Sequence, residues 1–137
     1  MSVPAHALLV RVYYEDTDFS GLVYHASYLR FLERGRTELL RAAGIDQMAL
    51  HRESGLAFAV RRMTLDWLKP ARMDDLVGVE TRAAEVRGAS IVLAQRILRA
   101  EELLVTAEVR VAVIGAGGRP ARLPDGLRAV LDPSTKA

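Results

Sequence analysis

The chain has 137 residues, 50% of them hydrophobic and 26% charged, which is typical of a single folded domain. Nineteen Lys and Arg residues oppose 17 Asp and Glu residues, and a net charge of +2 does not indicate nucleic-acid binding. The absence of cysteine excludes disulfides, thiolate nucleophiles and Cys-ligated zinc. No run approaches the roughly 18–20 apolar residues of a membrane-spanning helix. Because no secretory signal is recognisable either, we expect a cytoplasmic protein without stable membrane insertion.

The N-terminal half of the sequence predicts one strand followed by two helices. These elements are expected over residues 8–14, 26–43 and 46–54. Apolar residues recur every three or four positions in the long helix, which indicates one buried stripe. The stripe consists of Tyr28, Phe31, Leu32, Gly35, Leu39 and Ala43. Gly44 is placed to end this helix in a left-handed conformation, while Asp46 and Gly55 mark the limits of the second helix.

In the C-terminal half the apolar period becomes two, which predicts extended strands. The strands are expected from after Gly55 to Trp67 and over residues 76–86, 90–99 and 103–114, with a short helix over 123–131. Short turns separate consecutive strands, and strands joined in this way pair antiparallel. The long helix must then cover the concave face of the sheet, which defines an α+β domain over residues 1–137.

A motif with potential chemistry lies between the first strand and the long helix. Residues 13–41 read YYEDTDFSGLVYHASYLRFLERGRTELLR. Together with RRMTLDWLKPARMDDL and RGASIVLAQRI, this pattern resembles the YbgC-type branch of the 4-hydroxybenzoyl-CoA thioesterase family. The resemblance covers nearly the whole chain and fades after Ile114. It implies a hotdog fold, in which an antiparallel β-sheet wraps around one long central helix, and hydrolysis of an acyl-CoA thioester without any cofactor.

Asp18 precedes the long helix, whose unpaired N–H groups and partial positive charge suit a developing oxyanion. A carboxylate facing a thioester carbonyl could attack it directly or deprotonate a water molecule. On spacing alone, an Asp in this place is more often a turn or cap residue. The resemblance implies that Asp18 is the catalytic carboxylate and that the backbone N–H of His25 polarises the carbonyl.

The resemblance also suggests residues that bind substrate or CoA. They are Tyr14, Gly21, Val23, Tyr24, Arg62, Arg87 and Ser90. Arg87 and Ser90 are candidate contacts of the CoA phosphates, although an ordinary hairpin explains them equally well. Arg61 and Arg62 are neighbours on a strand and are expected to face opposite sides, one of them reaching the pantetheine channel.

We expect no metal site and no serine nucleophile. Asp16 and Asp18 offer two carboxylates without a neighbouring His, and Asp16 is expected to order the loop or face solvent. The three histidines are scattered along the chain, at His6, His25 and His51. We expect His6 and His51 at the surface. Ser90 lies in a hairpin and lacks the second Gly of a nucleophile elbow.

The expected partner is an acyl-CoA, with a carrier-protein thioester left open as the substrate. The resemblance implies a homodimer or homotetramer with active sites between subunits, and relatives often accompany Tol–Pal cell-envelope genes. One rival function is a non-catalytic acyl-thioester binding or regulatory protein, which would not need the carboxylate of Asp18. Another is a dehydratase or hydratase, whose His and acid pair Asp18 and His25 reproduce only loosely. The type and length of the acyl group stay open.

Overall fold

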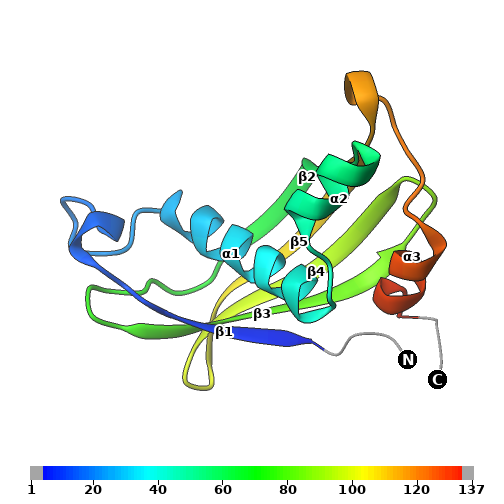
Figure 1. The fold of residues 1–137 in the computed structure, drawn as a ribbon. Helices are drawn as coiled ribbons and strands as arrows, with labels where there is room; N and C mark the ends of the chain where they lie inside the picture. The colour runs from blue at the N-terminus through cyan, green and yellow to red at the C-terminus, as the bar shows by residue number, and fades with distance from the viewer. Residues whose placement is uncertain (1–4, 134–137) are drawn as a thin grey trace.

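The computed structural model describes residues 5–133, which contain a five-stranded antiparallel sheet with its longest helix across one face (Figure 1). The strands are β1 (His6–Arg11), β2 (Ala57–Trp67), β3 (Leu76–Val86), β4 (Ser90–Arg99) and β5 (Glu102–Ile114). The helices are α1 (Ser27–Ala42), α2 (Gln47–Ser54) and α3 (Asp125–Leu131), with 3₁₀ turns η1 (Tyr14–Asp16) and η2 (Ala116–Gly118). The order across the sheet is β1-β3-β4-β5-β2. Within the described residues, no helix is long and apolar enough to cross a membrane.

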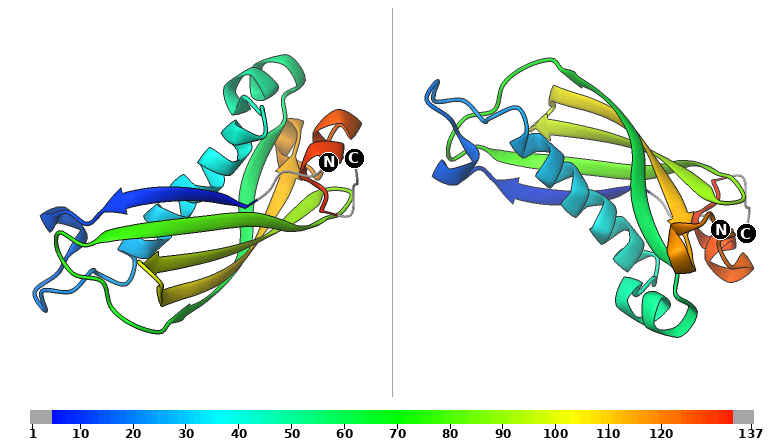
Figure 2. Two further views of the ribbon diagram at one scale, coloured as in Figure 1. Left: turned by 90° about the horizontal axis from the view of Figure 1, so that it is seen from below. Right: turned by 90° about the horizontal axis from the view of Figure 1, so that it is seen from above.

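The buried stripe predicted for α1 is confirmed and forms the centre of the core. Tyr28, Phe31, Leu32 and Leu39 are all buried against the sheet. The sheet meets them with alternating inward rows from β1, β3 and β4, over which α1 lies (Figure 2). Each fully buried large apolar side chain stabilises the fold by roughly 1.5–3 kcal/mol. The packing of this apolar stripe against the sheet therefore provides most of the stabilisation of α1.

The predicted helix limits are also confirmed. Gly44 and Gly55 have φ angles of +82° and +73°, the left-handed conformation expected after a helix. The side chain of Asp46 accepts a hydrogen bond from the Ala49 backbone N–H at 3.0 Å and caps α2. The two helices are therefore separated by local backbone chemistry that the sequence makes visible.

The first strand begins at His6 and ends at Arg11, so both of its ends lie earlier in the chain than predicted. β1 ends at Arg11, and Tyr14 lies in η1 instead of extending the strand to residue 14. The carboxylate of Asp16 accepts a hydrogen bond from the Tyr13 backbone N–H at 2.9 Å, which turns the chain here. Asp16 is buried and also lies 3.6 Å from an Arg30 guanidinium nitrogen, so it orders the loop, as one of its two expected roles required.

The pairing of consecutive strands is confirmed for β3, β4 and β5 and is wrong for β2. β2 pairs with β5, with Met63 opposite Val109, whereas β3 pairs with β1, with Val79 opposite Leu8. Residues 68–75 therefore form a crossover segment that passes along one end of the sheet. A period of two identifies a strand and its two faces, but it carries no information about which strand lies alongside.

A glycine allows α1 to approach β3 closely. A Cβ atom at Gly35 would lie 2.7 Å from Val79 Cγ1 and 2.8 Å from Thr81 Oγ1, which is overlap. Below it, Gln95 donates from Nε2 to the Leu32 carbonyl at 2.9 Å and to Thr81 Oγ1 at 2.8 Å. Buried polar groups require such partners, and the close approach of the helix supplies them.

We expect Gly35→Ala to lower the free energy of unfolding by about 1–3 kcal/mol through overpacking, which outweighs the helical preference of alanine. Gly126→Ala in α3 is the matched control, because nothing lies within 4 Å of its added Cβ, and it should be neutral or stabilising. Urea unfolding followed by circular dichroism measures both. Equal stability of the two variants would contradict the close contact.

Candidate active site

Asp18 lies in an exposed loop between η1 and α1, and Ser20 fixes its carboxylate. Asp18 Oδ1 accepts hydrogen bonds from the Ser20 backbone N–H at 2.8 Å and from the Ser20 hydroxyl at 2.5 Å. The Asp18 N–H donates to the Leu22 carbonyl at 3.1 Å, and Gly21 supplies the left-handed turn with a φ of +82°. An Asp that bonds two residues ahead forms an Asx turn, so the loop itself orients the carboxylate.

This arrangement holds the pKa of Asp18 below its ordinary value. The hydrogen bond from the Ser20 hydroxyl is the largest cause and that from the Ser20 N–H the second, against a small opposing effect of burial. The charge of His25 adds a further lowering. Within residues 5–133, Asp18 Oδ2 accepts no hydrogen bond. Asp18 is thus ionised at neutral pH, with one oxygen free to act as a base or nucleophile.

His25 precedes α1 and is held from the far edge of the sheet. Its carbonyl accepts a hydrogen bond from Trp67 Nε1 at 3.2 Å, and its ring meets the Trp67 ring edge-on, with 6.0 Å between centroids. The Tyr24 ring lies 4.6 Å from the His25 ring, between centroids. In the part of the chain that the structure describes, the His25 backbone N–H has no acceptor. It is a donor available near the positive end of α1.

The other residues predicted in this segment differ in what they can contact. The side chains of Tyr14 and Tyr24 are exposed and available to a ligand. Val23 is buried, and its N–H donates to the Ala71 carbonyl at 2.9 Å. Its contribution is therefore to support the loop through packing and backbone pairing rather than through side-chain contact.

The two Asp residues of the motif lie in unlike environments, one buried and one exposed. Among residues 5–133, no cluster of three or more His, Asp or Glu side chains could hold a metal ion. His51 is exposed, as expected. The prediction that His6 lies at the surface is wrong, because β1 turns this half-buried side chain toward the core. Among residues 5–133, its Nδ1 atom is buried without a hydrogen-bond partner.

Arg87 and Ser90 lie far from Asp18 within one chain. β3 begins next to the crossover segment and ends at the hairpin that carries both residues, and a strand of this length extends roughly 35 Å. Arg128 of α3 donates to the Arg87 carbonyl at 2.9 Å, and Figures 1 and 2 show α3 and the Asp18 loop at opposite ends of the sheet. The side chain of Arg87 instead pairs with Glu85 at 2.8 Å.

A bulge interrupts β2 between Val60 and Arg62. The simple alternation expected for Arg61 and Arg62 therefore fails at this point, because a bulge inserts an extra residue. Arg62 stands opposite Arg110, next to the inward-facing Met63, and so lies on the outer face of the sheet. The side chains of Arg61 and Arg62 are both exposed.

Ser20 and Trp67 contact this site but are not among the residues predicted from the sequence. The Asp-x-Ser spacing of an Asx turn is a signal that could have indicated Ser20. No comparable signal exists for Trp67, because its bond to the His25 carbonyl joins residues 42 positions apart. A long-range contact of this kind appears only when the sheet is assembled.

Comparison with known proteins agrees with this geometry. A model of the thioesterase-like superfamily matches residues 12–131. The acyl-CoA thioesterase YbgC of Haemophilus influenzae is 46% identical over 121 residues, which cover 88% of this chain and 89% of the relative. The acyl-CoA thioester hydrolase YbgC of Escherichia coli O6:H1 is 51% identical over 106 residues, covering 77% and 78%.

Solved structures share the same fold. A probable thioesterase from Bartonella henselae superposes with a TM-score of 0.84 at 44% identity and covers 88% of this chain and 100% of that chain. A 4-hydroxybenzoyl CoA thioesterase mutant superposes at 0.88 with 18% identity, covering 93% and 99%. The antiparallel sheet with α1 across it is therefore a hotdog thioesterase fold. The chain belongs to the thioesterase-like superfamily and, within it, to the YbgC family.

We expect Ser20→Ala to raise the pKa of Asp18 toward its ordinary 3.8, because the largest lowering contact is lost. The carboxylate then takes up its proton at a higher pH on acidification. A ¹³C NMR titration of the Asp18 carboxyl carbon measures this shift. Ser54→Ala removes another serine hydroxyl bond, to the Leu50 carbonyl in α2, and should leave Asp18 unchanged. An unaltered titration in Ser20→Ala would exclude the hydroxyl as the cause.

Proposed function

We propose that this chain is one thioesterase domain that hydrolyses acyl-CoA thioesters to the free acid and CoA. Asp18 is the catalytic carboxylate, and the His25 backbone N–H stabilises the oxyanion. The proposal rests on an ionised carboxylate with a free oxygen in the same segment as an unpaired N–H at the start of α1. The names of the YbgC relatives as acyl-CoA thioesterases support it. A cytoplasmic location and a Tol–Pal role remain predictions from the sequence.

Two routes are compatible with this arrangement. As a general base, Asp18 takes a proton from water while the water oxygen bonds to the thioester carbon, and the resulting oxyanion accepts a hydrogen bond from His25. The carbon–sulfur bond then breaks, and the departing CoA thiolate receives the proton from Asp18. As a nucleophile, Asp18 instead displaces CoA to form a mixed anhydride, which water hydrolyses. Neither route requires a metal or an organic cofactor.

We expect Asp18→Asn to lower kcat by about 100- to 10,000-fold, because the amide can neither accept the proton nor attack the carbon. CoA release, detected with a thiol reagent, is measured over aliphatic, aromatic and hydroxylated acyl-CoAs and carrier-protein thioesters. Asp46→Asn is the matched control and should retain activity, because Asn caps α2 as well as Asp. Activity that survives in Asp18→Asn would exclude Asp18 as the catalytic carboxylate. Binding without turnover by the unaltered protein would favour the acyl-thioester binding protein.

A second copy of the chain would complete this site. β2 is an 11-residue edge strand in which no residue is buried, and Val60 and Trp67 on its inner face are 48% and 47% exposed. The other edge, β1, offers only six residues. Long unpaired edges favour pairing with another strand. We therefore propose a homodimer that joins two β2 strands, and two such dimers could form a tetramer.

This dimer explains why the predicted CoA contacts lie far from Asp18. When two β2 strands pair antiparallel, the Ala57 end of one lies beside the Trp67 end of the other. The partner's Arg87 and the partner's Ser90 then lie at the same end of the joint sheet as Asp18. In this arrangement each active site takes its carboxylate from one subunit and its CoA contacts from the other.

We expect sedimentation to give a multiple of the 15.1 kDa chain mass, and Arg87→Met to lower kcat/KM by about 10- to 100-fold through loss of a charged contact. Mixing Arg87→Met with Asp18→Asn should restore activity, because each mixed dimer regains one intact site, giving about a quarter of the original sites after random exchange. If the protein is a dimer but mixing the two variants restores no activity, the proposal that each site takes residues from both subunits is contradicted. A monomer would contradict the interface.

A further inference from the structure

The crossover segment (residues 68–75) supports the Asp18 loop at its helix end. The Val23 N–H donates to the Ala71 carbonyl at 2.9 Å, and Leu22 forms a β-bridge with Arg72. The Ala71 N–H donates to the Tyr28 hydroxyl at 2.9 Å, which ties the same point to the first turn of α1. The backbone between Asp18 and the helix therefore rests directly on residues 71 and 72.

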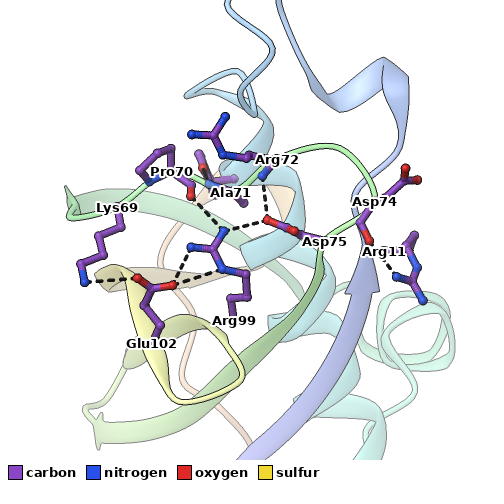
Figure 3. A network of polar contacts seen from close by, with 10 residues as sticks. Arg11, Lys69, Pro70, Ala71, Arg72, Asp74, Asp75, Arg99 and Glu102 are labelled. Carbon is purple, nitrogen blue, oxygen red and sulfur yellow. Dashed lines mark hydrogen bonds and ion pairs between the residues drawn. The ribbon is translucent and has the colours of Figure 1, made fainter.

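The same segment also supports the loop at its strand end. The Val12 N–H donates to the Asp75 carbonyl at 2.8 Å, and the Asp74 N–H donates to the Val12 carbonyl at 3.0 Å. Arg11 reaches the Asp74 carbonyl at 2.7 Å (Figure 3). Asp74 has a φ of +71°, a left-handed conformation that costs energy in a residue with a side chain. Both flanks of the Asp18 segment are thus attached to one turn whose shape must be maintained.

Arg99, the last residue of β4, maintains that turn from below. Its Nη1 donates to Asp75 Oδ2 at 2.7 Å and to the Pro70 carbonyl at 3.2 Å. The same Asp75 oxygen accepts from the Arg72 N–H at 2.9 Å (Figure 3). Burial alone would raise the pKa of Asp75, but the hydrogen bonds from Arg72 and Arg99 together hold it below its ordinary value. The guanidinium therefore joins the two ends of the 70–75 turn.

Arg99 is itself held by the next strand. Its Nε and Nη2 both donate to Glu102 Oε1, at 3.2 and 2.5 Å, and Lys69 lies 3.2 Å from the other Glu102 oxygen (Figure 3). A guanidinium offers its donors in a rigid plane, so it can bond Glu102, Asp75 and a carbonyl at once. A lysine at this position has a single point charge and cannot reproduce all of these contacts.

We propose that Arg99 is a positioning residue for the Asp18 loop and that it acts through Asp75 and the crossover segment without touching the substrate. The inference rests on the proposed thioesterase function. A displacement of about 1 Å in a positioned group costs up to roughly 100-fold in rate. Loss of the Arg99 guanidinium and its contacts should therefore affect the chemical step more than substrate binding.

The test compares Arg99→Met with Arg96→Met. Arg96 lies on the same strand and pairs with Glu80, but this pair is on the outer face and has no contact with the crossover segment. We expect Arg99→Met to lower kcat at least tenfold with KM within about threefold of the original, and Arg96→Met to change neither. The ¹³C shift of the Asp18 carboxyl carbon should move in Arg99→Met and not in Arg96→Met.

Arg99→Lys keeps the charge and the fold and should give an intermediate kcat, so the test does not depend on the stability of Arg99→Met. An unchanged kcat in Arg99→Lys together with an unmoved Asp18 resonance in Arg99→Met would overturn the inference. If the unaltered protein lacks thioesterase activity, the proposed function fails instead. The Asp18 resonance still decides whether Arg99 positions the loop in that case.

Discussion

The chain must cross the end of the sheet past β5 and β4 between β2 and β3, because β2 is an edge strand and β3 lies on the far side of β4. A segment in this place cannot use a regular ladder, so its backbone groups need other partners. The Leu68 and Lys69 N–H groups donate to the Leu104 carbonyl at 2.8 and 3.2 Å, and the remaining length is held by Arg99 and Asp75. Polar contacts at one end of the molecule therefore replace the regular strand pairing that the crossover segment lacks.

Those contacts also explain how the Asp18 loop can be exposed to solvent and still be ordered. Under the proposed function Asp18 meets the substrate, so it cannot be buried in the core that fixes Tyr28 and Phe31. Its position is determined instead by short backbone bonds to the crossover segment and by the Asx turn with Ser20. A solvent-exposed carboxylate gains precision in this way, because the Ser20 hydrogen bonds that orient Asp18 also outweigh the desolvation that raises its pKa.

Much of this arrangement follows from local sequence patterns. The stripe of α1, the cap at Asp46 and the left-handed residues at Gly44 and Gly55 depend on neighbours within a few positions, and all were predictable. The same holds for the alternating faces of β3, β4 and β5. The motif around Asp18 could be recognised by resemblance, and its turn chemistry by spacing.

The remainder depends on contacts between distant parts of the chain. The pairing of β2 with β5 could not be predicted from periodicity. Because β2 was expected beside β3, the crossover segment between them was expected to be a tight turn. The bond from Trp67 to the His25 carbonyl requires the pairing of β2 with β5 first. The contact of Arg99 with Asp75 requires β3 to lie beside β4, and it joins residues 24 positions apart in the chain. Local patterns therefore identify the candidate site residues, whereas the topology determines which contacts hold them in place.

The proposed homodimer would account for both the exposed β2 edge and the distance between Asp18 and Arg87. A sheet with all of its functional residues at one end would need no second copy, yet here the hairpin of Arg87 lies at the end opposite Asp18. Antiparallel pairing at β2 superimposes unlike ends of the two chains, and no other symmetric use of that edge does so. The exposed β2 strand and the separation of Asp18 from Arg87 thus both support the proposed homodimer, in which each site takes residues from two chains.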